Sequence, residues 1–245
     1  MKTFFTTIIL SVTFFITPLS LPAAQAAEGP AAPEAAPRFD DWIVIGPGGG
    51  GGQFYPTVSP HDENIACVRC DMTGSFVTLD GGASWRMFNL RGASDFFVFD
   101  PVNPDVIYTK NVGLYRSADK GRTWNLVHPN PDDVEKFVVS GDHGEVAIVL
   151  KDKDPEPKPE GQRVVGPAAW GSYDQVSALA VDPADSKILY ASIGRGDNWG
   201  LFVSKDWGKS WQEASKLPSV GRAVYVDPKS PSESRTVYVL SLIHI

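Results

Sequence analysis

The chain has 245 residues, of which 42% are apolar and 11% aromatic, and this is enough for the core of one large all-β domain or of two smaller domains. Its formal net charge of −7 argues against nucleic acid or an anionic membrane surface as the main partner. Neutral and cationic ligands remain open.

The amino-terminal residues 1–26 have the pattern of a secretory signal peptide. Lys2 precedes an apolar run at 4–21, and Ala24-Gln25-Ala26 offers a small-x-small cleavage site. The following residues 27–38, rich in Ala, Pro and Glu, are expected to form a linker. We therefore predict a secreted, periplasmic or cell-surface protein that is not inserted in the membrane after cleavage.

The last six residues, 240–245, read Leu-Ser-Leu-Ile-His-Ile, which is the translation of a transposon library adapter end. We predict that this segment is a sequencing artefact and that the natural chain continues past Val239. A different codon run in the source read would contradict this hypothesis.

An eight-residue pattern, [Ser/Thr]-x-Asp-x-Gly-x-[Ser/Thr]-Trp, occurs at 78–85, 117–124 and 204–211. The Asp can accept backbone hydrogen bonds in a hairpin turn, the Gly permits a positive φ, and the Trp can bury its ring between sheets. We call these segments the octapeptide turns, and we assign their aspartates a structural role. Their recurring residues are Asp80, Gly82 and Trp85, then Asp119, Gly121 and Trp124, then Asp206, Gly208 and Trp211.

A second marker, an apolar strand that ends in a proline turn, accompanies the octapeptide turns. Its prolines, Pro60, Pro101, Pro183 and Pro228, lie 41, 82 and 45 residues apart, so one unit near residue 142 lacks the marker. A repeat of about 40 residues with four short strands is typical of a propeller blade. The octapeptide turns resemble the Asp-box of the bacterial neuraminidase repeat family, which lies on blade hairpins of β-propellers.

The sequence therefore predicts an all-β fold at 39–239, an incomplete β-propeller of four-stranded antiparallel blades with Asp-box hairpins. About four to five blades are expected, preceded by a closing strand at 41–45 and interrupted by a charged, Pro-rich loop at 151–160. The strands expected in the first two units are 55–59, 65–70, 75–79 and 85–90, then 96–100, 106–110, 114–118 and 124–128.

Alternate turns of a blade lie on opposite faces, so the turn at 71–74 should share a face with the Gly-rich entry at 46–53, opposite the octapeptide turns. Asp71 is a site candidate, with a turn-capping role as the alternative. Gly49, Gly50 and Gly51 either let a ligand approach the backbone or form a flexible entry. Trp199, in the corresponding turn of the fourth unit, could stack on a sugar ring or pack internally.

The Gly-rich entry, the strand ending in a Pro turn and the following apolar-x-x-Asp-Met-x-Gly motif resemble the amino-terminal blade of family 74 glycoside hydrolases, which are xyloglucanase-like tandem propellers. The resemblance covers 42–91. It implies inverting hydrolysis of β-glucan chains, with Asp71 as the general base and the general acid in a second propeller outside this chain. Inverting enzymes place the two carboxyl groups about 6.5–9.5 Å apart.

Non-catalytic propellers remain an alternative, because sortilin-like domains and photosystem II assembly factors resemble this chain in the same repeats. The partner is then a protein or a glycan, whereas the hydrolase acts on a polysaccharide. Sialidases share the repeat but need an arginine cluster for the substrate carboxylate, so we rank that activity last.

Cys67 and Cys70 lie three positions apart on one expected strand, where they span about 10 Å and face opposite sides. This favours two buried thiols over a disulfide. The histidines have no ligand spacing, so we expect no metal, and no motif indicates another cofactor.

Overall fold

The computed structural model describes residues 46–48, 51–71, 74–90, 92–139, 146–151 and 173–241. Contacts divide the chain into two units, 1–43 and 44–245, and every described residue lies in the second. The predicted signal peptide at 1–26, the linker at 27–38, the closing strand at 41–45 and nearly all of the loop at 151–160 lie outside the described residues.

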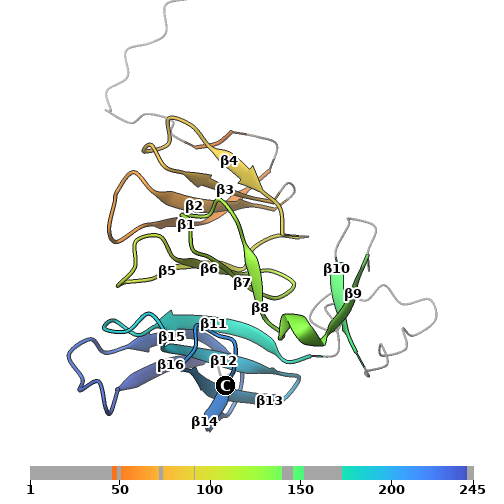
Figure 1. Cartoon of the computed structure of the whole chain (residues 1–245), viewed down its shortest axis with the longest axis vertical. Helices are drawn as coiled ribbons and strands as arrows, with labels where there is room; N and C mark the ends of the chain where they lie inside the picture. Colours follow the sequence, from red (N-terminus) through yellow and green to blue (C-terminus); the bar gives the residue numbers. More distant parts are fainter. Residues whose placement is uncertain are drawn as a thin grey trace, which may run out of the picture. The chain divides into compact units, whose positions relative to one another are not determined.

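Three four-stranded antiparallel sheets form the body of the described chain, and in each the strands lie in sequence order (Figure 1). The first contains β1 (Gln53–Val58), β2 (Ala66–Cys70), β3 (Gly74–Thr78) and β4 (Arg86–Phe88). The second contains β5 (Phe96–Phe99), β6 (Ile107–Lys110), β7 (Leu114–Ser117) and β8 (Asn125–His128). The third contains β11 (Gln175–Val181), β12 (Leu189–Arg195), β13 (Asn198–Ser204) and β14 (Gln212–Leu217). These sheets confirm the predicted class, an incomplete propeller of four-stranded blades.

Two further pairs of strands form two-stranded sheets. The short 3-10 helix η1 (Pro131–Asp133) leads into β9 (Val134–Val139) and β10 (Val146–Leu150), and β15 (Gly221–Val226) pairs with β16 (Val237–Ser241). β16 includes Leu240 and Ser241, the start of the segment predicted to be an artefact, whose other residues lie outside the described part. No helix among the described residues is long and apolar enough to cross a membrane.

The first strands of successive sheets lie next to one another, β1 beside β5, β5 beside β11 and β11 beside β15. Between the first and second sheets, Val77 and Phe88 share a buried cluster with Phe97. Between the second and third sheets, Tyr108 and Leu189 share another. The sheets therefore pack face to face around their first strands, as propeller blades do.

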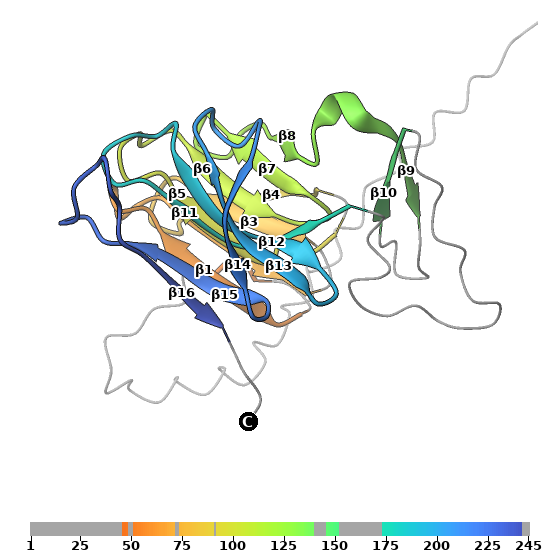
Figure 2. The same cartoon turned by 90° about the horizontal axis from the view of Figure 1, so that it is seen from below.

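The sequence predicts a unit around residue 142, between the second and third sheets. In the structure those two sheets pack directly on each other, so no blade separates them. β9 and β10 form a separate two-stranded hairpin (Figure 2), in which Ile148 packs against Tyr115 of the second sheet and against Tyr173.

The octapeptide turns form the same hydrogen bonds in all three sheets. In the second sheet, Asp119 Oδ1 accepts bonds from Ser117 Oγ (2.7 Å) and Thr123 N (2.8 Å), and Oδ2 accepts one from Thr123 Oγ1 (2.6 Å). Equivalent bonds surround Asp80 and Asp206. Each carboxylate is therefore occupied within its own turn.

Each octapeptide turn is also bonded to the first turn of its own sheet, and the second one contacts the adjacent sheet. Lys120 N donates to the Asp105 carbonyl at 2.9 Å, and Gly81 and Trp207 make the equivalent bond. The ring of Trp124 stacks on Phe88 of the first sheet, with centroids 4.9 Å apart. The turn thus holds a large apolar ring between neighbouring sheets.

The aspartates of the Asp-Pro turns link successive sheets. Asp100 Oδ1 accepts hydrogen bonds from Val102 N at 2.8 Å and from Ser186 Oγ of the third sheet at 3.0 Å. Asp182 receives a bidentate pair from Arg235 of the β15–β16 hairpin, at 2.8 and 2.9 Å. The second sequence marker therefore recurs because it closes one turn and anchors the next sheet.

Both cysteines lie on β2, and both are buried thiols that form no disulfide, in agreement with the sequence-based expectation. Pairing with β3 is regular from Ala66 to Cys70, so the strand has no bulge that could bring the sulfurs together. Burial raises the pKa of the Cys67 thiol to about 12, with a small opposing effect of Arg86.

His128 ends β8 and is half-buried between other elements. Its Nε2 donates to the Asp174 carbonyl at 2.8 Å, and its ring lies edge-on to Tyr173 and Trp211, at 6.4 and 6.5 Å. Burial lowers the pKa of the imidazole below its ordinary value, while the bond to Asp174 and the charge of that residue oppose the shift. The folded state therefore favours neutral His128.

Replacing Asp119 by Ala removes the acceptor of three hydrogen bonds in the second octapeptide turn. We expect the free energy of unfolding to fall by about 1–3 kcal/mol, measured by urea denaturation. The matched control is Asp105→Ala, which removes only an exposed ion pair with Lys120 at 3.8 Å and should cost less than about 0.5 kcal/mol. Equal denaturation midpoints for the two variants would contradict the structural role of the turn.

Protonation of His128 is harder in the folded than in the unfolded chain, so the free energy of unfolding should decline as the pH falls below about 6.5. The variant His128→Gln keeps a donor for the Asp174 carbonyl but does not titrate. Between pH 7 and 5, its loss of stability should be smaller than that of the parent protein in urea titrations. Parallel pH profiles would show that His128 does not contribute.

Candidate functional site

The candidate site lies at the end of the sheets opposite the octapeptide turns. The second strands β2, β6 and β12 end there at Cys70, Lys110 and Arg195. The first strands begin at the same end, since Gln53 pairs with Cys70, Phe96 with Lys110 and Gln175 with Gly194. The turn that contains Asp71 and the turn before Trp199 therefore share one face.

Asp71 lies directly after β2, and its side chain is exposed. Its backbone N donates to the Gly52 carbonyl at 3.2 Å, and the Cys70 thiol lies 3.6 Å from Oδ1. A Cβ atom added to Gly51 would lie 2.2 Å from Asp71 Oδ1 and 2.8 Å from Cys70 Sγ. The structure thus brings the Gly-rich entry against the Asp71 carboxylate, and a larger residue at 51 would displace that side chain.

Of the other candidate glycines, Gly49 and Gly50 lie outside the described residues. Gly52 is described, and an added Cβ there would meet the Phe54 ring at 2.8 Å and Asp71 Oδ2 at 3.6 Å. The close approach of backbone to carboxylate therefore extends over Gly51 and Gly52.

Tyr55 is a feature that the sequence analysis treated as an ordinary strand residue. It has a φ of 53°, it is 53% exposed, and it lies where the pairing of β1 with β2 shifts register between Phe54 and Thr57. The guanidinium carbon of Arg69 lies over the rings of Phe54 and Tyr55, 5.0 and 5.3 Å from their centroids. A bulky residue with positive φ is rare, and before a proline an extended conformation is the usual one.

A cavity of about 910 Å³ lies on the same face, among the first strands, and we call it the axial cavity. Its aromatic and apolar lining includes Tyr55 from β1, Phe96 from β5, Val176 from β11 and Trp199 from β13. Trp199 Nε1 donates to the Gly196 carbonyl at 2.7 Å, which fixes the indole in its turn. Trp199, a residue predicted from the sequence, therefore lines the same cavity as Tyr55, which sequence reasoning missed.

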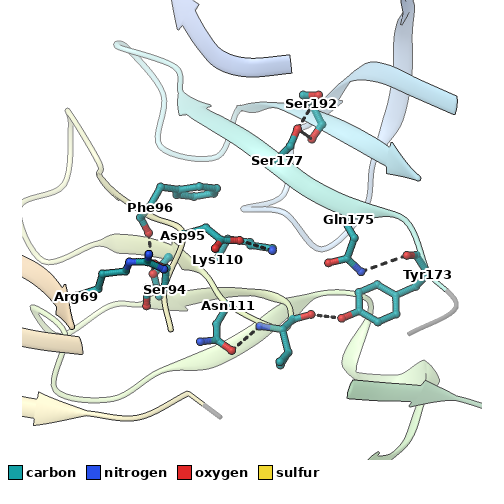
Figure 3. Close-up of polar contacts among 12 residues, drawn as sticks. Arg69, Ser94, Asp95, Phe96, Lys110, Asn111, Tyr173, Gln175, Ser177 and Ser192 are labelled. Carbon is teal, nitrogen blue, oxygen red and sulfur yellow. Dashed lines mark hydrogen bonds and ion pairs between the residues drawn. The ribbon is translucent and has the colours of Figure 1, made fainter. Parts of the chain in front are cut away.

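The polar lining of the axial cavity includes Asp95, directly before β5, Lys110 of β6 and Gln175 of β11 (Figure 3). Lys110 forms an ion pair with Asp95, and the two side chains are 4% and 38% exposed. Burial lowers the pKa of Lys110, and Asp95 opposes that shift. Gln175 is 5% exposed and donates from Nε2 to the Tyr173 carbonyl at 3.3 Å, while its Oε1 is buried without a hydrogen-bond partner.

Within the described residues, no group of three His, Cys, Asp or Glu side chains is arranged to hold a metal ion. The groups that the face offers are the exposed Asp71 carboxylate, two aromatic rings and the amide oxygen of Gln175.

No protein-family model matches the chain. The chain is 27% identical over 229 residues to a xyloglucanase of Paenibacillus sp and 26% identical over 231 residues to xyloglucanase Xgh74A of Acetivibrio thermocellus. Each alignment covers 84% of this chain, which spans only 19% and 23% of those relatives. A solved ancestral GH74 enzyme aligns with 76% of this chain and 23% of its own, at 18% identity and a TM-score of 0.47. The similarity to xyloglucanases thus extends over most of the chain and confirms the resemblance that its first blade indicated.

Proposed function

We propose that this chain functions in an exported, xyloglucanase-like glycoside hydrolase that cleaves β-glucan chains with inversion, and that Asp71 is its general base. The close approach of Gly51 to the exposed Asp71 carboxylate carries the proposal. Sequence similarity to xyloglucanases over 84% of the chain supports the same activity.

Asp71 differs from the octapeptide aspartates in what its oxygens contact. Asp80 accepts hydrogen bonds from Thr78 and Ser84 on both oxygens, as Asp119 and Asp206 do from their own turns. Asp71 Oδ1 instead lies 3.6 Å from the Cys70 thiol, which is a weak donor. An exposed carboxylate with weak partners can accept a proton from a bound water, which is the task of a general base.

Gly51 fixes the position of this carboxylate from the other side. Any larger residue would place its Cβ inside the space that Asp71 Oδ1 and Cys70 Sγ occupy. The Asp71 N–H bond to the Gly52 carbonyl holds the two segments together at this point. The pair therefore forms a built arrangement of backbone and carboxylate, as a positioned base requires.

The general acid is expected outside this chain, in a second propeller, as the resemblance implies. Asp95 lines the axial cavity, but it is ion-paired with Lys110 and in that state has no proton to donate. We therefore assign Asp95 no acid role. Export by the predicted signal peptide fits a polysaccharide substrate, which is found outside cells.

In the intact protein, Asp71→Asn should lower kcat on xyloglucan by about 10²–10⁴-fold, because the amide cannot act as a base. Thermal denaturation and oligosaccharide binding should stay close to those of the parent protein. A folded variant with full turnover would exclude Asp71 as the base. A folded parent protein without turnover on any β-glucan would instead favour the alternative, a propeller that only binds a protein or a glycan.

Gly51→Ala tests the positioning of Asp71, because the added Cβ displaces the carboxylate. We expect kcat on xyloglucan to fall by about 10–100-fold, as for a displacement of about 1 Å. The matched control is Gly46→Ala in the same entry segment, since a Cβ at Gly46 meets no atom within 4 Å. If both variants keep parental turnover, Gly51 does not set the geometry of the base.

A further inference from the structure

We propose that the axial cavity is a glycan-binding subsite in which the ring of Tyr55 stacks on a sugar and Gln175 Oε1 accepts a sugar hydroxyl. Tyr55 is then a positioning residue for the polysaccharide. The inference deepens the proposed hydrolase and rests on it for the class of ligand. Its two observations, the backbone of Tyr55 and the free oxygen of Gln175, are independent of Asp71.

The backbone of Tyr55 is strained without the compensation found at similar residues. Among the described residues, three that are not glycine have positive φ: Tyr55 (53°), Lys120 (58°) and Trp207 (63°). Lys120 and Trp207 lie in octapeptide turns, where their backbone N–H groups donate at 2.9 and 3.0 Å. The Tyr55 carbonyl accepts a bond from Thr57 Oγ1 at 3.0 Å, but this bond would form equally well with glycine at residue 55.

Neither burial of the Tyr55 side chain nor its contact with Arg69 compensates for the strain of the backbone. The residue is 53% exposed, and Phe54 already offers Arg69 a ring at 5.0 Å. Strained residues that the fold does not need cluster at ligand sites, where the strain sets the direction of a side chain. At residue 55 the strained backbone directs the tyrosine ring to the axial cavity, whose lining includes Tyr55.

The lining of the axial cavity fits a polyhydroxylated ring with an apolar face. Tyr55 and Trp199 both line the cavity; the Arg69 guanidinium lies over one face of the Tyr55 ring, and the indole N–H of Trp199 is bonded to Gly196. Gln175 Oε1 can accept a hydroxyl, and Asp95, whose side chain is 38% exposed, offers a second acceptor. Figure 3 shows this oxygen of Gln175 on the side of the ion pair between Asp95 and Lys110. Arg195 and Arg222, also in the lining, can donate to sugar oxygens.

The test uses the intact protein in the Asp71→Asn background, so that a xyloglucan oligosaccharide binds without being cleaved. Adding Tyr55→Gly should weaken its binding by about 10-fold in calorimetry, because a stacking ring is lost. It should also raise the melting temperature by about 2–4 °C, because glycine adopts positive φ without strain. Tyr55→Phe should keep the affinity, since the ring remains.

The matched control is Tyr225→Ala. Tyr225 also lies on a first strand, β15, and is 59% exposed, but it is not part of the cavity lining. Its loss should leave oligosaccharide affinity unchanged. Unchanged affinity after Tyr55→Gly, or a lower melting temperature with unchanged affinity, would make Tyr55 structural and overturn the proposal.

The two proposals fail in different ways. Parental turnover that Asp71→Asn abolishes, together with an affinity that Tyr55→Gly does not change, would support the hydrolase and overturn the subsite. Absent turnover, with binding that Tyr55→Gly weakens, would support the subsite and overturn the hydrolase. Absent binding and absent turnover would overturn both.

Discussion

The hydrogen bonds that each octapeptide aspartate accepts inside its own turn determine how the rest of the propeller is arranged. They fix the hairpin, and the next backbone N–H fastens the hairpin to the first turn of the same sheet, as Lys120 does to Asp105. The tryptophan that follows then occupies a fixed place, such as that of Trp124 on Phe88. Because local bonds set this ring and the ring fills the space between sheets, a short motif controls the packing of whole blades.

The same bonds divide the aspartates of the chain by what they can do. The octapeptide aspartates have both oxygens occupied, and Asp182 is paired with Arg235. Asp71 lies at the other end of the sheets, exposed and beside Gly51. A carboxylate is available for proton transfer only where the fold does not occupy its oxygens, and the proposed base Asp71 lies on the face opposite the octapeptide aspartates.

The strands and turns of the first two sheets could be predicted from the sequence because their signals are local: short apolar runs between Gly, Pro and Asp turns. The position of the β9–β10 hairpin could not, because it depends on the contact of Ile148 with Tyr115 and Tyr173, which are distant in sequence. The meeting of Gly51 with Asp71 followed in outline from the alternation of turns. The free oxygen of Gln175 did not, because a strand residue carries no sign of which partner its side chain lacks.

Tyr55 shows why a site can contradict local sequence rules. Tyrosine before proline favours an extended strand, yet the residue has a φ of 53° at a register shift of β1. Glycine would satisfy the backbone at lower cost, because it adopts positive φ without strain. The proposed subsite accounts for a tyrosine in that conformation by its ring, because Tyr55 lines a cavity on the face of Asp71. Tyr55 and Asp71 thus share one property: their side chains take no part in the hydrogen bonds and burial that stabilise the blades.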